Sequence, residues 1–285
     1  MKKKILITGT SGFIGSHLIK KLPNHISALE NDGKNIDLRF RNEVLKLSKV
    51  NTVIHLAGKI PSEKNFSQNI FFEHNVLGTL NVLEYCVEKK IKKLIYVSSY
   101  VYGDSKNNPI NEKEIIQPHN VYTKSKVLAE ELCKIYGKKF GINIIILRPF
   151  NIFGNSLKNN FLISNILKSI KNNKPITIVN KNDERDYLYI DDFVDAIIKV
   201  IDYDCNYEIF NVGSGECISF EKLINLFEQK SGKKVKKVIK SSKVHIRKIQ
   251  ADITKINKKT GWKPRYSLEE GIEIVLQKNK LFIQK

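Results

Sequence analysis

Three glycines spaced three residues apart follow a short apolar run near the start of this chain. The run is Ile5-Leu6-Ile7, the glycines are Gly9, Gly12 and Gly15, and a helix-like stretch continues from Ser16 to Leu22. A strand that leads through a glycine turn into a helix directs free backbone N–H groups and a positive dipole end to one point. The segment therefore predicts a pyrophosphate cradle, with a glycine-rich turn that binds no ligand as the alternative.

Each glycine has a separate expected role. Gly9 allows the tight turn, Gly12 lets the backbone approach the phosphates, and Gly15 leaves room where the helix packs on the strand. The usual dinucleotide fingerprint has its first two glycines two residues apart. The spacing of three and three is a wider variant of it.

Apolar runs alternate with helical stretches over the first half of the chain, which predicts an α/β fold with a Rossmann-type, doubly wound parallel sheet. The expected strands are Ile5 to Thr8, Ile26 to Leu29, Thr52 to Leu56, Lys93 to Ser98 and Asn143 to Leu147. Two helices are expected between them: Leu77 to Val87, with Leu77, Leu80, Leu83 and Val87 on its apolar face, and Val121 to Phe140.

The pattern changes after Arg148-Pro149, where Asn and Lys become frequent and short strands mix with helices. We expect a dinucleotide-binding domain over residues 1–150 and a smaller α/β substrate-binding lobe over 151–285, with parts near 186–215 returning to the first domain. In this lobe Tyr207 to Val212 is predicted to form a strand and Phe220 to Lys230 a helix.

The formal net charge of +20 comes mainly from lysine, which supplies 43 of the 49 basic residues. The densest basic stretch runs from Lys233 to Lys248 without an acidic residue, and we expect it to be solvated surface. A flank that binds a diphosphate is the alternative. No aromatic side chain is interleaved there for base stacking, so nucleic-acid binding is not expected.

The cysteine and histidine spacing and the hydropathy of the chain argue against disulfide bonds, a metal site and a membrane span. Cys86, Cys133, Cys205 and Cys217 form no C-x-x-C pair, so we expect four reduced thiols and a cytoplasmic location. The six histidines form no i, i+3 or i, i+4 pairs, so no metal site is expected. No apolar run reaches the length of about 18 residues that a membrane span needs.

An acidic residue at the end of the second strand usually holds the adenosine ribose of a bound dinucleotide. Glu30 lies at that point, and its charge would repel a 2′-phosphate, which favours NAD over NADP. An ordinary loop acid is the alternative, and Arg39 and Arg41 keep NADP possible. Asp37-Leu38 is expected near the adenine.

Ser98, Tyr122 and Lys126 are the candidate catalytic group. Ser98 ends a predicted strand, and Tyr122 and Lys126 lie four residues apart at the start of the next predicted helix. A lysine ammonium and a cationic nicotinamide ring would both favour the tyrosine phenolate, which then acts as a general base or acid. The spacing alone is weak evidence, since Tyr85 with Lys89 and Tyr102 with Lys106 share it.

These residues, in this order, resemble the extended short-chain dehydrogenase/reductase family, in its branch of NAD-dependent nucleotide-sugar epimerases, dehydratases and reductases. The segments that carry the resemblance are Thr8 to Gly15, His55-Leu-Ala-Gly58, Asn75-Val-Leu-Gly-Thr79, Val97 to Gly103, Tyr122-Thr-Lys-Ser-Lys126, Leu147-Arg-Pro-Phe-Asn151, Arg185 to Asp192, Asn211-Val-Gly213 and Gly261-Trp-Lys-Pro264. Together they cover nearly the whole chain.

The resemblance implies a role for each matching residue. Ser98, Tyr122 and Lys126 match the catalytic group, and Lys126 is also expected to hold the nicotinamide ribose. The positions expected to contact the cofactor are Gly9, Ser11, Gly12, Phe13, Ile14, Gly15, Glu30, Asp37, Leu38, Leu56, Ala57, Gly58, Asn75, Tyr122, Lys126 and Pro149. Those expected to contact a nucleotide-sugar substrate are Ser98, Ser99, Asn151, Arg185 and Arg247. A salt bridge to Asp186 or Asp191 is the alternative for Arg185.

Departures from the family pattern narrow the expected chemistry. Ser99 and Tyr100 stand where the 4,6-dehydratases carry an acidic pair, so dehydration is not expected. The decarboxylases carry an acid and GDP-fucose synthase a cysteine at the Tyr100 position, which disfavours both. Many relatives have Arg-Pro-Gly where this chain has Ser242-Lys243-Val244, which puts diphosphate binding by that segment in doubt.

We therefore expect an NAD-dependent nucleotide-sugar C4 epimerase that works through a transient 4-keto sugar. The first alternative is an NAD(P)H-dependent nucleotide-sugar 4-ketoreductase, which would need the same Ser98, Tyr122 and Lys126. The second is a non-catalytic regulator that senses NAD or binds nucleic acid. The resemblance also implies a homodimer formed through the helices Leu77 to Val87 and Val121 to Phe140. The alternative is that the apolar faces of these helices are buried inside the monomer.

Overall fold

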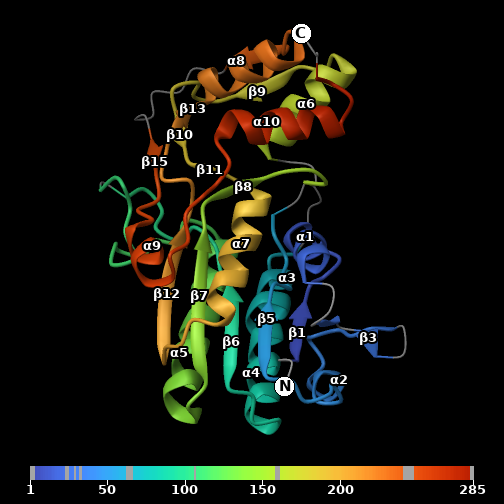
Figure 1. Cartoon of the computed structure of the whole chain (residues 1–285), viewed down its shortest axis with the longest axis vertical. Helices are drawn as coiled ribbons and strands as arrows, with labels where there is room; N and C mark the ends of the chain where they lie inside the picture. The colour runs from blue at the N-terminus through green and yellow to red at the C-terminus, as the bar shows by residue number, and fades with distance from the viewer. Residues whose placement is uncertain are drawn as a thin grey trace.

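The computed structural model of the chain describes residues 4–22, 26–28, 30–31, 34–61, 67–105, 107–157, 161–239 and 247–282. Among these residues, six parallel strands form one sheet in the order β12-β7-β6-β5-β1-β2 (Figure 1). The strands are β1 (Ile5–Thr8), β2 (Ile26–Ala28), β5 (Thr52–His55), β6 (Lys93–Val97), β7 (Asn143–Pro149) and β12 (Tyr207–Val212). The predicted α/β fold with a Rossmann-type sheet is confirmed.

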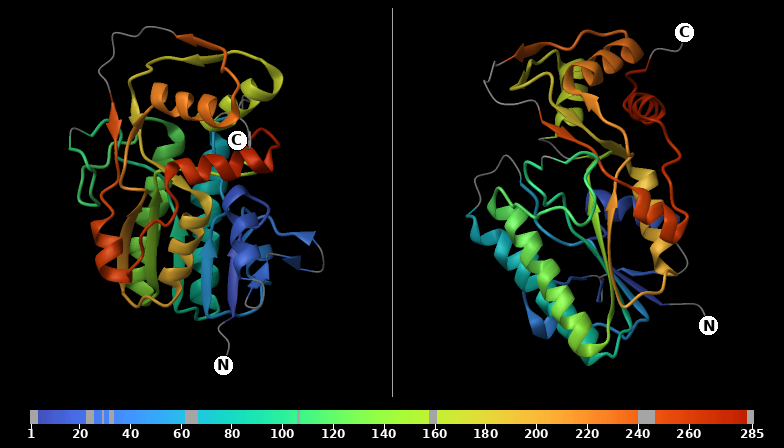
Figure 2. Two further views of the ribbon diagram at one scale, coloured as in Figure 1. Left: turned by 45° about the horizontal axis from the view of Figure 1, so that its top comes forward. Right: turned by 90° about the vertical axis from the view of Figure 1, so that its left-hand side faces the viewer.

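The central strands are apolar because the sheet is covered on both faces. Helices α1 (Phe13–Lys21) and α7 (Ile190–Ile201) pack together on one face, and α4 (Gly78–Glu88) and α5 (Val121–Phe140) on the other, as the right-hand view of Figure 2 shows. The short helix α2 (Arg41–Val44) packs beside α4. Every residue of β1, β5 and β6 is buried as a result.

Strand β7 extends two residues beyond its predicted end at Leu147. Arg148 and Pro149 pair in register with Asn211 and Val212 of β12, a strand from the second half of the chain. This pairing carries the backbone in extended form to Pro149, directly before the residues expected to face the substrate.

Helix α5 matches its predicted limits because both of its ends carry strong signals. Asn120 and Thr123 form a reciprocal capping box at the N-terminus, with Thr123 N donating to Asn120 Oδ1 over 2.8 Å. Gly141 ends the helix with a φ of +66°, a conformation that glycine adopts without strain.

The predicted apolar face of Leu77 to Val87 is wrong at Leu77, whereas Leu83 is buried and Val87 packs against the core. Residues Phe72–Leu77 form a π-helix, η1, which the short helix α3 (Asn69–Phe71) precedes and α4 follows. A π-helix has a wider turn than an α-helix, so it changes the direction in which the following residues point. Leu77 is therefore exposed, and Val82 and Cys86 are buried beside Leu83.

The second lobe contains small sheets that lie above the carboxyl ends of the main strands (Figure 1). Strand β8 (Asn151–Phe153) pairs with β11 (Tyr187–Tyr189), β9 (Ile176–Ile178) with β14 (Lys237–Ile239), and β10 (Glu184–Arg185) with both β13 (Ile218–Ser219) and β15 (Lys248–Ile249). The helices of the second half besides α7 are α6 (Leu162–Asn172), α8 (Phe220–Ser231), α9 (Thr254–Thr260) and α10 (Leu268–Lys278). The domain boundary near residue 150 stays a prediction.

None of the helices in the described part of the chain combines the length and apolar character needed to cross a membrane.

Candidate active site

The glycine segment forms a tight loop between β1 and α1. Gly9 has a φ of +75°, and Gly12 N donates to Gly9 O over 3.0 Å. A Cβ at Gly15 would lie 2.2 Å from Gly9 O, so this glycine is required by the backbone of the loop itself rather than by the strand. Helix α1 begins at Phe13, three residues earlier than predicted.

The first turn of α1 lacks a side-chain cap, because Gly12 occupies the N-cap position. The amides of Phe13, Ile14 and Gly15 cannot bond within their own helix. They point out of the helix end together with its positive dipole, so the loop fits the pyrophosphate of a dinucleotide.

Thr8 and His55 hold the segment Leu56 to Gly58, the next one that was expected to contact the cofactor. The Thr8 hydroxyl oxygen accepts the amides of Leu56 and Ala57, both over 3.1 Å, and lies 2.7 Å from His55 Nδ1. A Cβ at Gly9 would lie 2.7 Å from Ala57 N, so the two loops touch. Thr8 and His55 were not among the predicted site residues, although both lie in the motifs that carry the resemblance.

The hydrogen-bond partners of His55 determine its tautomer. Thr79 Oγ1 donates its proton to Asn75 O over 2.6 Å, so it accepts from His55 Nε2 over 3.0 Å. His55 Nδ1 is then unprotonated and accepts from Thr8. Burial, and secondarily the charge of Lys126, lowers the pKa of His55 to about 3, which keeps the ring neutral.

Asn75 lies inside the π-helix η1 and is fully buried. Its Oδ1 accepts from Lys59 N over 2.7 Å, and its Nδ2 donates to Lys59 O over 3.1 Å and to Ser125 Oγ over 2.9 Å. A Cβ at Gly58 would lie 2.8 Å from Asn75 Oδ1. Asn75 therefore holds the loop around Gly58, and its predicted direct contact with the cofactor stays a prediction.

Ser98 follows β6 at the carboxyl edge of the sheet, where its amide donates to Leu147 O over 2.8 Å. Its hydroxyl is buried and has no hydrogen-bond partner among the residues that the structure describes. A buried hydroxyl without a partner is costly. An oxygen of a bound substrate would satisfy it.

Tyr122 lies in the first turn of α5, with its ring against Phe71 at a centroid distance of 5.8 Å. Burial raises the pKa of Tyr122, and a hydrogen bond with Ser99 lowers it by less. Without a bound cofactor, burial therefore favours the neutral phenol. Lys126 Nζ donates to Val97 O over 2.7 Å, and its expected effect on Tyr122 stays a prediction.

Lys126 is almost completely buried one turn after Tyr122. Its Nζ lies 4.3 Å from the centre of the Tyr96 ring. Burial lowers the pKa of Lys126 to about 7, against the opposing effects of Glu130 and Cys133.

Both arginines that kept NADP possible have carboxylate partners. Arg39 binds both carboxylate oxygens of Asp37, the shortest bond being 2.6 Å, and lies 3.3 Å from Glu73. The Arg39 hydrogen bond lowers the pKa of Asp37. Arg41 pairs with Glu84. Glu30 lies in the short strand β3 (Glu30–Asn31), paired with β4 (Lys34–Asn35), and its side chain lies outside the described part of the structure.

A cavity of about 300 Å³ brings Asn151, Arg185 and Arg247 together. Its other lining residues are Tyr100, Gly103, Asp104, His119, Phe150 and Ile249. The cavity thus joins the turn after β6, the end of β7 and the strands β8, β10 and β15 of the second lobe. Its position beyond the carboxyl ends of the strands is where open α/β sheets bind their ligands.

Asp183, which was not predicted, holds the two arginines. Its buried carboxylate lies 3.0 Å from Arg185 Nη2 and 3.4 Å from Arg247 Nε, and it also accepts from Arg247 N over 3.1 Å. The alternative partner Asp186 instead accepts from the amides of Ser214, Gly215 and Ala251. Asn151 Nδ2 donates to Asp186 O over 2.9 Å.

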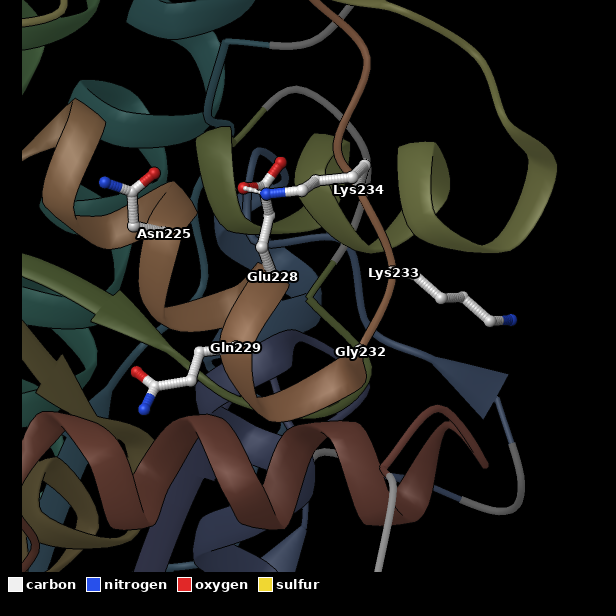
Figure 3. A pocket seen from close by; sticks show the side chains of 6 residues that line it. All are labelled: Asn225, Glu228, Gln229, Gly232, Lys233 and Lys234. Atoms are coloured by element: carbon white, nitrogen blue, oxygen red, sulfur yellow. Dashed lines mark hydrogen bonds and ion pairs between the residues drawn. The ribbon is translucent and has the colours of Figure 1, made fainter.

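A second hollow, of about 520 Å³, lies at the C-terminal end of α8. Asn225, Glu228, Gln229, Gly232, Lys233 and Lys234 line it (Figure 3). Glu228 lies 3.2 Å from Lys234 Nζ and accepts from Val235 N over 2.8 Å. Lys233 and Lys234 begin the basic stretch, and the Ser242-Lys243-Val244 departure lies outside the described residues.

No group of three or more His, Cys, Asp or Glu side chains suited to a metal ion occurs among the described residues.

Comparison with known proteins gives one consistent family. Residues 5–213 match the model of the NAD dependent epimerase/dehydratase family. A putative UDP-glucose 4-epimerase of Methanocaldococcus jannaschii is 31% identical over 95% of this chain and 97% of its own length. A dTDP-4-dehydro-6-deoxyglucose reductase of Escherichia coli is 30% identical over 97% of both chains. The structure of RMD from Pseudomonas aeruginosa complexed with NADPH is 27% identical, with a TM-score of 0.87 over 96% of this chain and 98% of that one.

Proposed function

This chain belongs to the NAD-dependent epimerase/dehydratase family, and on that premise we propose that it is a nucleotide-sugar C4 epimerase that uses NAD. The family comprises NAD(P)-dependent nucleotide-sugar epimerases, dehydratases and reductases. The observation that carries the proposal is the buried, unpartnered hydroxyl of Ser98 at the edge where Tyr122 and Lys126 also lie.

In the proposed reaction Tyr122 accepts the proton of the C4 hydroxyl, and Ser98 Oγ hydrogen-bonds the same oxygen. NAD, when bound at the glycine loop, supplies the acceptor for the C4 hydride. Lys126 holds the nicotinamide ribose, and its ammonium stabilises the developing phenolate. The 4-keto sugar then rotates and presents its other face. Return of the hydride to that face of C4, together with return of the proton from Tyr122 to the oxygen, would complete the epimerisation and restore NAD.

Asn151, Arg185 and Arg247 are proposed to hold the nucleotide sugar, with the arginines at its diphosphate. Guanidinium groups match phosphate oxygens through two parallel hydrogen bonds. Arg247 is about half exposed and so can turn toward a ligand, whereas Arg185 is fixed by Glu184 O and Arg247 O.

NAD is proposed over NADP because the nearby arginines are engaged. A 2′-phosphate would have to compete with Asp37 and Glu73 for Arg39 and with Glu84 for Arg41.

A nucleotide-sugar 4-ketoreductase is the second candidate, and Tyr100 favours it. The Tyr100 hydroxyl donates to Gly103 O over 2.6 Å, and its ring packs edge-on against Phe150 at 5.2 Å. A keto sugar bound against this fixed aromatic wall would have less room for the rotation that reduction on either face needs.

The experiment that separates the candidates follows product and cofactor together. The protein is incubated with NAD and UDP-, dTDP- and GDP-hexoses, and with NADH or NADPH and 4-keto sugar nucleotides. A C4 epimer without net change in NADH supports the epimerase, and stoichiometric NADH or NADPH oxidation by the keto sugar supports the reductase. Salt-sensitive DNA binding without turnover would favour the regulator instead.

A further inference from the structure

A buried chain of polar side chains connects the catalytic helix to the wall of the cavity. It begins at Glu130 on α5 and continues through Arg148 on β7. Arg148 Nε donates to both carboxylate oxygens of Glu130, over 3.0 and 3.2 Å, and Nη2 donates to Oε2 over 2.5 Å. The remaining nitrogen, Nη1, donates to the Tyr102 hydroxyl over 2.8 Å.

The chain ends at β12 and at the segment that precedes α5. The Tyr102 hydroxyl donates to Asn211 Oδ1 over 2.6 Å. Asn211 Nδ2 in turn donates to Ile110 O over 2.9 Å, and its backbone amide donates to Glu112 Oε1 over 2.8 Å. Because Tyr102 has a single proton, which it gives to Asn211, its oxygen is free to accept from Arg148, and each bond has one direction.

The four side chains of this network, Glu130, Arg148, Tyr102 and Asn211, are each at most 4% exposed. A buried ion pair is seldom a net source of stability compared with apolar residues of similar size. A fully satisfied buried network does, however, select one arrangement of the elements that it joins. The network therefore indicates that α5, β7, β12 and the turn at Tyr102 are held in one precise arrangement.

Three of the four members, Glu130, Tyr102 and Arg148, lie close in sequence to a residue of the site. Glu130 is one turn after Lys126 on α5, Tyr102 lies between Tyr100 and Gly103, and Arg148 shortly precedes Phe150 and Asn151. Arg148 also stacks on the Tyr102 ring, 5.1 Å from its centre.

We propose that Arg148 and Tyr102 are positioning residues that hold the cavity wall around Tyr100 and Gly103 in register with Tyr122 and Lys126. The catalytic consequence rests on the proposed function, whereas the mechanical coupling is a property of the protein alone. Arg148 acts as the hub, because its planar fork reaches two different elements at once.

Tyr102→Phe tests the coupling by removing one hydroxyl and keeping the ring. Tyr85→Phe is the matched control, since Tyr85 is equally buried and its hydroxyl donates to Ser48 O over 2.5 Å, in the core that contains α4. Hydrogen–deuterium exchange of the unliganded protein is expected to speed up over residues 99–120 in Tyr102→Phe but not in Tyr85→Phe. Unchanged exchange in this segment would overturn the proposal.

Binding separates positioning from a general loss of stability. Calorimetry with UDP, dTDP and GDP is expected to give about tenfold weaker binding of the preferred diphosphate to Tyr102→Phe. The NAD affinity should stay within about twofold, and both affinities of Tyr85→Phe should be normal. A parallel loss of both affinities, or no loss, would contradict a positioning role.

Arg148→Lys provides a second variant that keeps the charge but loses the fork. It is expected to show the same selective loss as Tyr102→Phe, with a larger rise in KM than fall in kcat once a substrate is known. Wild-type affinity for the diphosphate and wild-type kinetic constants would refute the role of Arg148. If the unmodified protein binds none of the three diphosphates, the proposed function fails, and the exchange experiment still decides the coupling.

Discussion

The side chain of Lys126 ends in a titratable ammonium group and is almost completely buried. Val97 O accepts one of its protons, the Tyr96 ring lies beneath it, and His55, Glu130 and Cys133 are the other titratable groups that act on it or respond to its charge. Its pKa falls from 10.5 to about 7 because burial outweighs the attraction of Glu130. The charge of Lys126 therefore changes within the physiological range.

Lys126→Met is expected to change how stability depends on pH. Below pH 7 the folded and unfolded chains both carry the proton, so the cost of burying the charge is fully present. Above pH 7 the folded chain loses the proton that the unfolded chain keeps, and the wild type gains stability relative to Lys126→Met. The gain is at most about 1.4 kcal/mol per pH unit. Urea unfolding of both proteins from pH 6 to 9 measures it, and a constant difference would contradict the buried charge.

Tyr122→Phe tests the proposed proton transfer. Loss of a general acid–base group lowers turnover by about 10²- to 10⁴-fold, and the ring contact with Phe71 is retained. NAD affinity should change by less than about twofold, because the glycine loop is untouched. Steady-state kinetics and NAD titration measure the two effects. Near-normal kcat would exclude Tyr122 as the base.

At the scale of elements, the loop between β1 and α1 depends on the absence of a side chain at Gly15. Gly15→Ala places a methyl group 2.2 Å from Gly9 O, which forces the loop apart at a cost of about 1–3 kcal/mol. We expect NAD binding to weaken more than tenfold, measured by calorimetry. Gly141→Ala, also destabilising through its positive φ at the end of α5 but free of close contacts, should keep normal NAD affinity. Equal losses in the two variants would argue against the loop as the NAD site.

The elements that could be predicted are those with a long or strongly capped signal. β1 was correct to the residue, since a buried parallel strand reads as an apolar run, and α5 had its Asn120 cap and Gly141 stop. β12 was also correct to the residue, although it is only half-buried over its first three residues. The two- and three-residue strands of the second lobe were missed because such segments hold too few residues for a period to show. The π-helix η1 was missed for a different reason. Nothing local in Phe72–Leu77 distinguishes it from an α-helix.

The site could be predicted as a set of residues but not as a set of contacts. Asp183 and Asp186 both lie within two residues of Arg185, so spacing alone could not tell which one pairs with it. The position of Arg185 in strand β10 decides which of the two aspartates it pairs with. β10 turns Arg185 toward Asp183, while Asp186 collects the amides of a distant turn. Thr8, His55 and Thr79 likewise lie in motifs of the sequence. Their hydrogen bonds to one another could not be predicted, because the three residues belong to three separate elements, β1, β5 and α4.

At the scale of the whole molecule, η1 and α5 leave apolar side chains in solvent. Leu77 is 41% exposed, and Ile135 on α5 is 57% exposed. We expect a homodimer that buries this surface across a two-fold axis.

Ile135→Lys should convert that dimer into a monomer, because a lysine on each copy would meet an apolar face. Sedimentation velocity measures the mass. Ile115→Lys is the control, since Ile115 is 67% exposed and lies in the segment before α5 rather than in η1 or α5. A monomeric wild type, or a dimer that survives Ile135→Lys, would contradict the assigned surface.

The pairing of β12 with β7 limits how this protein can be dissected. A fragment that ends at residue 150 keeps every residue proposed to bind NAD, yet it strips the partner from the edge of β7 between Ile144 and Pro149. The exposed edge would offer its backbone to any neighbouring chain and template aggregation. Gene truncation is thus a poor route to a minimal NAD-binding module, and a circular permutant that keeps both strands is the better design.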